Sequence, residues 1–261
     1  MSNNVRHVLG ISGGKDSAAL AIYLKQQGRA PNIEYFFTDT GAELPETLAF
    51  IDRLEAYLGQ EIIRLGNDMP FEEHLKIFKN FLPSPKARWC TRYLKIRPFE
   101  DFVGDDEVVS YVGIRADELR DGYVARSKRI TPVFPFKEDG LVRDDIFRIL
   151  RETVGIPEYY RWRSRSGCYF CFYQRIDEWL GLLDNYPHFF QQAMDMEKED
   201  PLTRQRYTWI EGMSLSELKD NRAKYEGRKQ EEKKTTSWQE DILADVENDE
   251  YDDQACFMCS L

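Results

Sequence analysis

The chain has 261 residues, of which 42% are hydrophobic and 13% aromatic, and its formal net charge is −10. This length is enough to bury a sizeable core, as one large domain or as one domain with an extension. No apolar run approaches the roughly 20 residues that a membrane-spanning helix needs, and the first residues do not form a charged-then-apolar signal segment. We therefore expect a globular protein that acts in the cytoplasm, without a membrane partner.

The negative charge is concentrated at the C-terminal end. Residues 235–261 hold eight of the 46 acidic residues and no Lys or Arg, which leaves 36 basic and 38 acidic residues in the rest of the chain. The net charge thus does not exclude an anionic substrate, because the body of the protein is nearly neutral. Residues 235–261 carry little core-forming pattern, and we expect them to form a flexible acidic tail.

Strand-like and helix-like segments alternate in the first 115 residues. The apolar segments expected to be strands are 7–12, 32–38, 61–65 and 107–115. The segments between them expected to be helices are 17–27, which Gly28 ends, and 43–58, in which Leu44, Leu48, Ile51, Leu54 and Leu58 fall on one face. This alternation predicts the α/β class, with a doubly wound parallel sheet and right-handed crossovers.

The pattern becomes helical near residue 140. The segments expected to be helices there are 144–154, 174–183, 188–199 and 214–234, the last with Ser214 as N-cap before Glu217. We therefore predict three parts: an α/β core at 1–140, a helical extension at 141–234 that contains a Cys-x-x-Cys segment, and the acidic tail at 235–261.

The stretch SGGKDS at residues 12–17 joins the first expected strand to the first expected helix. Its two glycines let the backbone bend and approach a ligand closely, its lysine adds a positive charge, and its two serines add hydroxyl donors. A Gly-rich turn that leads into a helix N-terminus binds anions through backbone N–H groups. Because Asp16 follows Lys15, the stretch is not a Walker A motif, and its spacing is not that of a dinucleotide fingerprint. It predicts a phosphate site of another kind.

This loop resembles the PP-loop of the adenine-nucleotide α-hydrolase superfamily. Further motifs follow in order: TDTGAELPET at 38–47, RWCTRYLK at 88–95, GIRADE at 113–118 and GCYFC at 167–171. Together they resemble the phosphoadenosine phosphosulfate (PAPS) reductase-like family, over roughly residues 5–180. That family includes the PAPS reductases, the ATP-using sulfurylase subunit and the ATP pyrophosphatases of DNA phosphorothioation.

The resemblance implies a HUP-like fold that binds ATP with Mg²⁺ and cleaves it between the α- and β-phosphates. Catalysis of this kind is mostly positioning and charge neutralisation. The family pattern gives catalytic roles to Lys15, Asp16 and Arg115, the last at the end of a strand, where an open α/β sheet binds its ligand. The residues that it assigns to ATP binding are Ser12, Gly13, Gly14, Lys15, Ser17, Asp39 and Thr40.

The five cysteines are Cys90, Cys168, Cys171, Cys256 and Cys259. Their odd number, in a chain expected in a reducing compartment, argues against a disulfide framework. Family members with a [4Fe–4S] cluster have a similar far-apart arrangement, often with two adjacent cysteines at the first site, where this chain has Trp89 before Cys90. We expect Cys90, Cys168 and Cys171 to hold such a cluster; a structural zinc, or three thiols without metal, are the open alternatives.

Cys256 and Cys259 form a second Cys-x-x-Cys pair after the acidic run. A mobile dithiol there is suited to pass a persulfide or to resolve a disulfide, and incidental cysteines in a tail are the alternative. The acidic tail is also suited to dock a basic partner. We therefore expect a sulfur-donor protein, such as a cysteine desulfurase, and further subunits of a modification complex as partners.

Basic and aromatic residues are dense around Cys90 and Cys168. They are Lys86, Arg88, Arg92, Lys95, Arg97, Arg161, Arg163, Arg165 and Arg175, with Trp89, Trp162, Tyr169 and Tyr173 between them. If the two segments meet in the fold, the combination is suited to bind DNA or another nucleic acid. The alternative is that this charge serves ATP and the cluster.

The sequence thus favours an ATP pyrophosphatase that activates a target for sulfur incorporation, in the manner of DNA phosphorothioation. A second reading is a thiol-dependent reductase of PAPS or adenosine phosphosulfate. The intact loop argues against it, because those ligands lack a β/γ pyrophosphate. A third reading is a non-catalytic nucleotide-sensing adaptor in a larger complex, against which the intact Lys15, Asp16 and Ser17 argue.

Overall fold

The computed structural model describes residues 5–30, 32–66, 69–119, 128–199 and 202–226. In this part of the chain, five parallel strands form one sheet in the order β3-β2-β1-β4-β5. The strands are β1 (Arg6–Gly10), β2 (Ile33–Thr38), β3 (Ile62–Leu65), β4 (Val108–Tyr111) and β5 (Ile130–Val133). The predicted α/β class and parallel sheet are confirmed. Strand β5 was not predicted, because it is short and contains Pro132, a residue that sheets accept at their edges.

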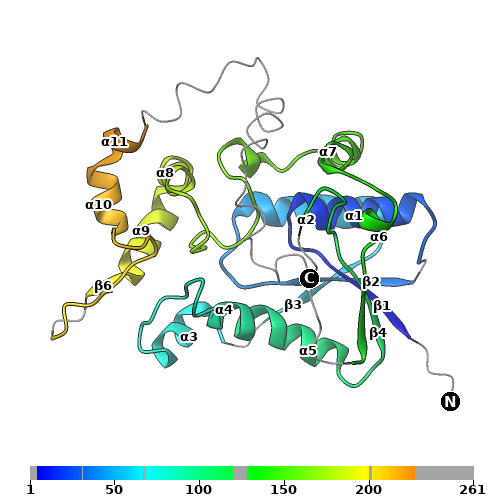
Figure 1. The fold of residues 1–261 in the computed structure, drawn as a ribbon, viewed down its shortest axis with the longest axis horizontal. Helices are drawn as coiled ribbons and strands as arrows, with labels where there is room; N and C mark the ends of the chain where they lie inside the picture. Colours follow the sequence, from blue (N-terminus) through cyan, green and yellow to red (C-terminus); the bar gives the residue numbers. More distant parts are fainter. Residues whose placement is uncertain (1–4, 31, 67–68, 120–127, 200–201, 227–261) are drawn as a thin grey trace.

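Helices cover both faces of the sheet, as a parallel sheet requires (Figure 1). On one face lie α1 (Lys15–Gln26), α2 (Pro45–Leu58) and α7 (Arg143–Arg151), and on the other lies α5 (Arg97–Val103). Strand residues alternate between the two cores: Leu9 belongs to the first, whereas Val8 and Phe36 belong to the second, where Phe36 stacks on Phe99.

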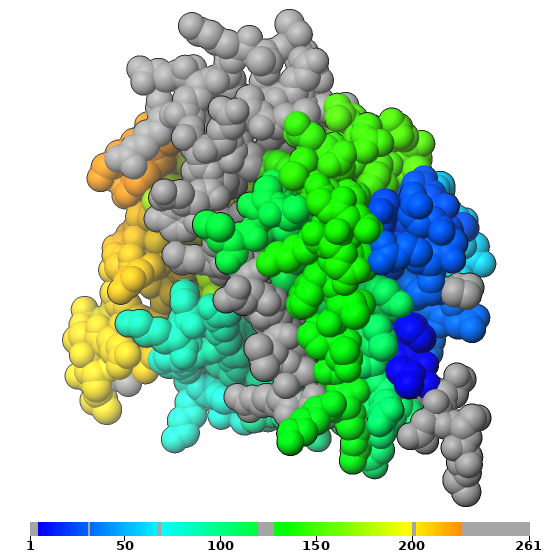
Figure 2. Space-filling view, turned by 45° about the vertical axis from the view of Figure 1, so that its right-hand side comes forward, coloured from blue at the N-terminus to red at the C-terminus, as the bar shows by residue number. Residues whose placement is uncertain are grey.

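The other described elements lie along one end of the sheet and in the extension. They are α3 (Phe71–Ile77), α4 (Trp89–Thr91), η1 (Arg92–Ile96), α6 (Pro135–Glu138), η2 (Glu158–Arg161), α8 (Ile176–Asn185), α9 (Pro187–Met196), β6 (Lys198–Glu199), β7 (Arg206–Tyr207), α10 (Leu215–Asp220) and α11 (Arg222–Glu226). Phe71 of α3 contacts Phe170 and Trp209 of the extension, so the extension packs beside α3 (Figure 2). The hydrophobic core is therefore continuous across residue 140.

Three details differ from the sequence-based expectation. Leu48 is exposed, because α2 turns Thr47 and Phe50 toward the core instead. Strand β4 ends at Tyr111, so Arg115 lies in the following loop and not at the strand end. The predicted helix at 214–234 has its Ser214 cap, with the Glu217 N–H donating to the Ser214 hydroxyl at 3.1 Å, but it is broken at Asn221 into α10 and α11.

The predicted flexible acidic tail at 235–261 lies outside the described residues. The second Cys-x-x-Cys pair, Cys256 and Cys259, lies in the same segment. Among the helices that are described, none is long and apolar enough to cross a bilayer.

Candidate functional site

The loops after β1 and β4 meet at the point where the strand order reverses. From β1 the chain continues to β2 on one side, and β4 lies on the other side. This switch point is where open α/β sheets bind ligands. The two loops touch closely: a Cβ atom on Gly113 would lie 3.0 Å from the backbone carbonyl of Asp16. The GIRADE loop is thus held against the start of α1.

The phosphate loop is a tight turn closed by its own side chains. Gly13 has a φ of +74°, which favours glycine, and a Cβ atom there would lie 2.4 Å from Cγ2 of Thr47. The Ser17 hydroxyl accepts the Ser12 N–H at 3.1 Å, and the Ser12 hydroxyl accepts the Gly14 N–H at 3.3 Å. The five predicted loop residues therefore lie together at the N-terminus of α1, where the helix dipole favours an anion.

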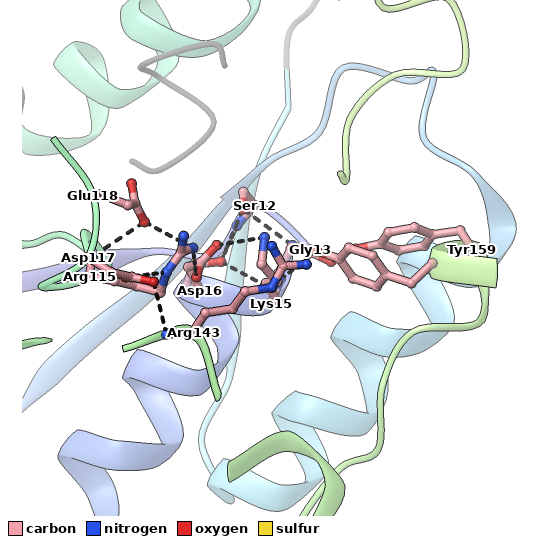
Figure 3. A network of polar contacts seen from close by, with 12 residues as sticks. Ser12, Gly13, Lys15, Asp16, Arg115, Asp117, Glu118, Arg143 and Tyr159 are labelled. Carbon is pink, nitrogen blue, oxygen red and sulfur yellow. Dashed lines mark hydrogen bonds and ion pairs between the residues drawn. The ribbon is translucent and has the colours of Figure 1, made fainter. Parts of the chain in front are cut away.

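An ion network joins the phosphate loop to the GIRADE loop (Figure 3). The Asp16 carboxylate lies 3.3 Å from Nζ of Lys15 and 2.9 Å from Nη1 of Arg115. Arg115 also pairs with Asp117 and Glu118, each at 3.0 Å. Burial lowers the pKa of Arg115, but the charges of Asp16 and Glu118 outweigh this effect and raise it. Arg115 thus stays charged although only 5% of its surface is exposed.

Arg143 is a basic residue at this site that the sequence analysis did not single out. It is the first residue of α7, and its backbone N–H donates to Asp117 at 3.3 Å. In Figure 3 its side chain extends toward Lys15. Its signal in the sequence was weak, because it stands 28 residues beyond Arg115 and outside the family motifs.

Two tyrosines of the helical extension form hydrogen bonds to the backbone of the phosphate loop. The hydroxyl of Tyr159 donates to the Gly13 carbonyl at 2.7 Å, and the hydroxyl of Tyr160 accepts the Lys15 N–H at 3.1 Å. Burial raises the pKa of both phenols, so both hydroxyls stay protonated. The Tyr160 oxygen accepts an N–H of the helix N-terminus that would otherwise point to a bound anion.

Removal of each hydroxyl should therefore give a different response to nucleotide. In Tyr160→Phe the Lys15 N–H loses its acceptor, and we expect a stability loss of about 1–3 kcal/mol that a bound phosphate restores. In Tyr159→Phe the Gly13 carbonyl loses its donor, and ATP should not restore the loss. Melting temperatures with and without ATP test this expectation. An equal gain from ATP in the two variants would contradict it.

Asp39 and Thr40, both predicted to contact ATP, face different surroundings at the end of β2. The Asp39 N–H donates to the Leu65 carbonyl at 3.0 Å, and Leu65 and Gly66 line a cavity of about 540 Å³. Thr40 lies toward the extension, where its Oγ1 is 3.1 Å from Sγ of Cys168. Asp39 therefore lies beside a cavity large enough for a nucleoside, whereas Thr40 contacts the cysteine segment.

Glu43 is a partly buried carboxyl group next to Thr40. It accepts a hydrogen bond of 2.6 Å from the Thr40 hydroxyl. Burial raises the pKa of Glu43 to about 7, although the Thr40 hydrogen bond and the charge of Lys95 oppose the shift. The sequence analysis quoted Glu43 in the TDTGAELPET motif but gave it no role.

The raised pKa of Glu43 predicts a pH-dependent cost to folding. Because the folded state keeps this proton at a pH where the unfolded chain has lost it, stability should fall as the pH rises from about 4.5 to about 7. A shift of this size corresponds to at most about 3 kcal/mol. Urea unfolding across this range should show the fall in the wild type but not in Glu43→Gln. A Glu73→Gln control, on the exposed surface of α3, should leave the pH profile unchanged.

The three predicted metal ligands Cys90, Cys168 and Cys171 line one cavity of about 40 Å³. A hydrogen bond from the Cys171 N–H to the Cys168 carbonyl (3.1 Å) closes the turn between these two residues. The buried Arg163 guanidinium donates to the carbonyls of Gly167 and Cys168 and fixes this turn. The segments around Cys90 and Cys168 thus meet.

The described residues do not present a grouped set of metal ligands at this cavity. Its volume is enough for one or a few water molecules. Among the described residues, no three His, Cys, Asp or Glu side chains are grouped as ligands of a metal ion. Burial raises the pKa of the Cys168 thiol, and Glu43 raises it further. The cluster and the zinc alternative stay predictions.

Comparison with known proteins finds a matching family model and several relatives. A family model described as the phosphoadenosine phosphosulfate reductase domain matches residues 6–132. Two uncharacterized proteins of Methanocaldococcus jannaschii are 28% and 23% identical to the chain, over 74% and 77% of it and over 41% and 51% of their own length. An uncharacterized nin region protein of Escherichia phage lambda is 27% identical over 43% of the chain and 49% of its own length. The chain thus spans about half the length of these relatives.

A crystal structure of PAPS reductase from Candida auris, in a phosphate complex, is similar with a TM-score of 0.44 and 15% sequence identity. The similarity covers 56% of this chain and 72% of that chain. The family match over residues 6–132 includes the phosphate loop and Arg115. Residues 6–132 of this chain, which form most of its α/β part, are therefore similar to the phosphoadenosine phosphosulfate reductase domain.

Proposed function

We propose that this protein is an ATP pyrophosphatase, which cleaves ATP between the α- and β-phosphates and so activates an acceptor for sulfur incorporation. The observation that carries the proposal is the complete phosphate loop, with Lys15 and Arg115 both paired to Asp16 at the switch point. Pyrophosphate gains negative charge as it leaves, and cations placed in advance stabilise that charge.

The residues around the loop are chemically suited to a nucleotide with Mg²⁺. Mg²⁺ takes oxygen ligands, and in nucleotide sites the phosphates and water supply most of them, with one or two carboxylates. Asp16 and Asp117 offer carboxylate oxygens beside the loop. The ion would offset the negative charge of the phosphates, and Lys15 and Arg115 would orient the phosphates. The cavity beside Asp39 is where we place the nucleoside.

The acceptor and the sulfur source follow from the family resemblance. We infer that the activated group belongs to DNA, as in phosphorothioation, and that a cysteine desulfurase delivers the sulfur within a larger complex. The contact of Thr40 with Cys168 supports a link between the two chemistries, because it joins the end of β2 to the cysteine cavity.

The test is the release of AMP and pyrophosphate from ATP with Mg²⁺ by the full chain. Lys15→Ala should slow release on the order of 10²- to 10³-fold, because it removes a cation from the leaving pyrophosphate. The matched control is Lys25→Ala, at the other end of α1. Nζ of Lys25 donates hydrogen bonds to the carbonyls of Tyr57 and Leu58. The proposal fails if Lys15→Ala and Lys25→Ala release pyrophosphate equally fast.

A PAPS or adenosine phosphosulfate reductase is the second candidate. The family match favours it, and so does the three-cysteine cavity, because such a reduction needs thiols. Release of sulfite from PAPS with a thiol donor, together with no turnover of ATP, would support this candidate over the first.

A further inference from the structure

Two arginines from distant parts of the chain contact one aromatic ring at the cysteine cavity. Cζ of Arg88 lies 5.2 Å from the ring centroid of Tyr173, and Cζ of Arg165 lies 5.5 Å from it. Tyr173 itself lines the cavity that holds Cys90 and Cys171. The basic segments around the cysteines thus meet here, which was the condition that the sequence analysis set for a nucleic-acid site.

Neither arginine forms an ion pair with a carboxylate among the described residues. Arg88 donates from Nε to the Pro85 carbonyl at 3.2 Å, and Arg165 donates from Nη2 to the Tyr173 carbonyl at 3.0 Å. Nε and Nη1 of Arg165 are buried without a hydrogen-bond partner in the described part of the chain. Buried guanidinium N–H groups without acceptors are costly, and two like charges at one ring repel each other. An anion bound to both guanidinium groups would relieve both costs.

The backbone around Arg165 is fixed by buried polar contacts. The carboxylate of Glu178, which is fully buried, accepts both the N–H and the hydroxyl of Ser164, at 2.7 and 2.6 Å. Arg163 is anchored on the carbonyls of Gly167 and Cys168. Arg165 stands between these anchors, and its own Nη2 donates to the Tyr173 carbonyl. Its guanidinium is thus held in place before a ligand binds, which lowers the entropic cost of binding.

We propose that Arg88 and Arg165, with Tyr173, form a binding site for a tetrahedral oxyanion beside the three-cysteine cavity, which Tyr173 lines. A guanidinium matches two oxygens of such an anion with two N–H groups. The source of the oxyanion is either a nucleic-acid phosphodiester or a free ion such as sulfate. A phosphodiester here would place the DNA acceptor of the proposed function beside the thiols, and only this interpretation of the site rests on that function.

Binding of two probes to the full chain tests the site without ATP. The probes are sulfate, followed by thermal shift, and a labelled single-stranded oligonucleotide, followed by anisotropy. Arg165→Gln and Arg88→Gln should each weaken binding about 10- to 100-fold, as expected for the loss of a charged hydrogen bond. Arg53→Gln is the matched control, because Arg53 lies 5.6 Å from the Phe50 ring on the surface of α2, away from the cavity.

Lys15→Ala separates this site from the phosphate loop. Sulfate held by the loop is lost in Lys15→Ala and kept in Arg165→Gln, whereas sulfate at the proposed site shows the reverse. For the oligonucleotide, each arginine removed should reduce the slope of log affinity against log salt by about 0.7. Arg88 is exposed, so Arg88→Gln serves as the second variant if Arg165→Gln does not fold.

The outcomes distinguish the two sources of the oxyanion, and one of them would reject the site. Oligonucleotide binding that depends on both arginines and slows alkylation of Cys90 and Cys171 identifies a phosphodiester. The same dependence for sulfate alone identifies a free oxyanion. Binding of both probes that is unchanged in Arg88→Gln and Arg165→Gln overturns the proposal, and it leaves the ATP pyrophosphatase activity untouched as a separate question.

Discussion

Arg115→Met should destabilise the protein by about 3–5 kcal/mol, the usual loss when one partner of a buried ion network is removed. Arg115 is buried and forms ion pairs with Asp16, Asp117 and Glu118. Without its guanidinium, Glu118, whose side chain is only 5% exposed, loses its ion pair with Arg115. Urea unfolding monitored by fluorescence measures the loss, and Glu118→Gln in the same background should recover part of it.

A surface arginine provides the matched control for this prediction. Arg64 also pairs with two carboxylates, those of Asp52 and Glu55, but on the exposed side of α2. Arg64→Met should cost only about 0–1 kcal/mol, because solvent screens exposed ion pairs. Equal losses in Arg64→Met and Arg115→Met would show that Arg115 has no special structural role.

Gly13→Ala should disrupt the phosphate loop and remove ATP binding. The substitution forces a side chain into a backbone with a φ of +74°, which costs about 1–2 kcal/mol. It also places a Cβ atom 2.4 Å from the buried Thr47 side chain, so that the loop or α2 must move. Calorimetric titration with ATP should show no binding, and the melting temperature should fall.

Gly28→Ala separates backbone strain from the clash. Gly28 has a φ of +62° at the other end of α1, and a Cβ atom there would meet nothing within 4 Å. Backbone strain should lower the stability of this variant about as much as it does in Gly13→Ala, but the variant should bind ATP as the wild type does. If Gly13→Ala also binds ATP normally, the loop does not hold the phosphates.

The sequence was sufficient to predict the features that local patterns determine. Four of the five strands of the parallel sheet, the α1 and α2 helices and the Ser214 cap follow from periodicity and capping residues. The SGGKDS loop and Arg115 were recognised as motifs, and the structure places them together through Asp16. Asp117 and Glu118 were within a quoted motif, but their pairing with Arg115 was not anticipated.

The features that the sequence did not predict depend on contacts between distant segments. Tyr160 meets Lys15 across 145 residues, and no local pattern distinguishes a tyrosine that holds a loop from one that fills a core. Burial raises the pKa of Glu43, which lies near Cys168 of a segment more than 100 residues away. Leu48 was misassigned because the buried face of α2 is set by the packing of Thr47 against the loop. Tertiary packing, not propensity, decides each case.

The most direct measurement is the position of the bond that the protein breaks in ATP. With label on the α-phosphate or on the γ-phosphate, a quenched reaction resolves the products of each. We predict that the α-label appears in AMP or in an adenylated acceptor and that the γ-label appears in pyrophosphate. A γ-label in orthophosphate, with ADP as the other product, would contradict the proposed function, and so would sulfite release from PAPS with ATP left intact.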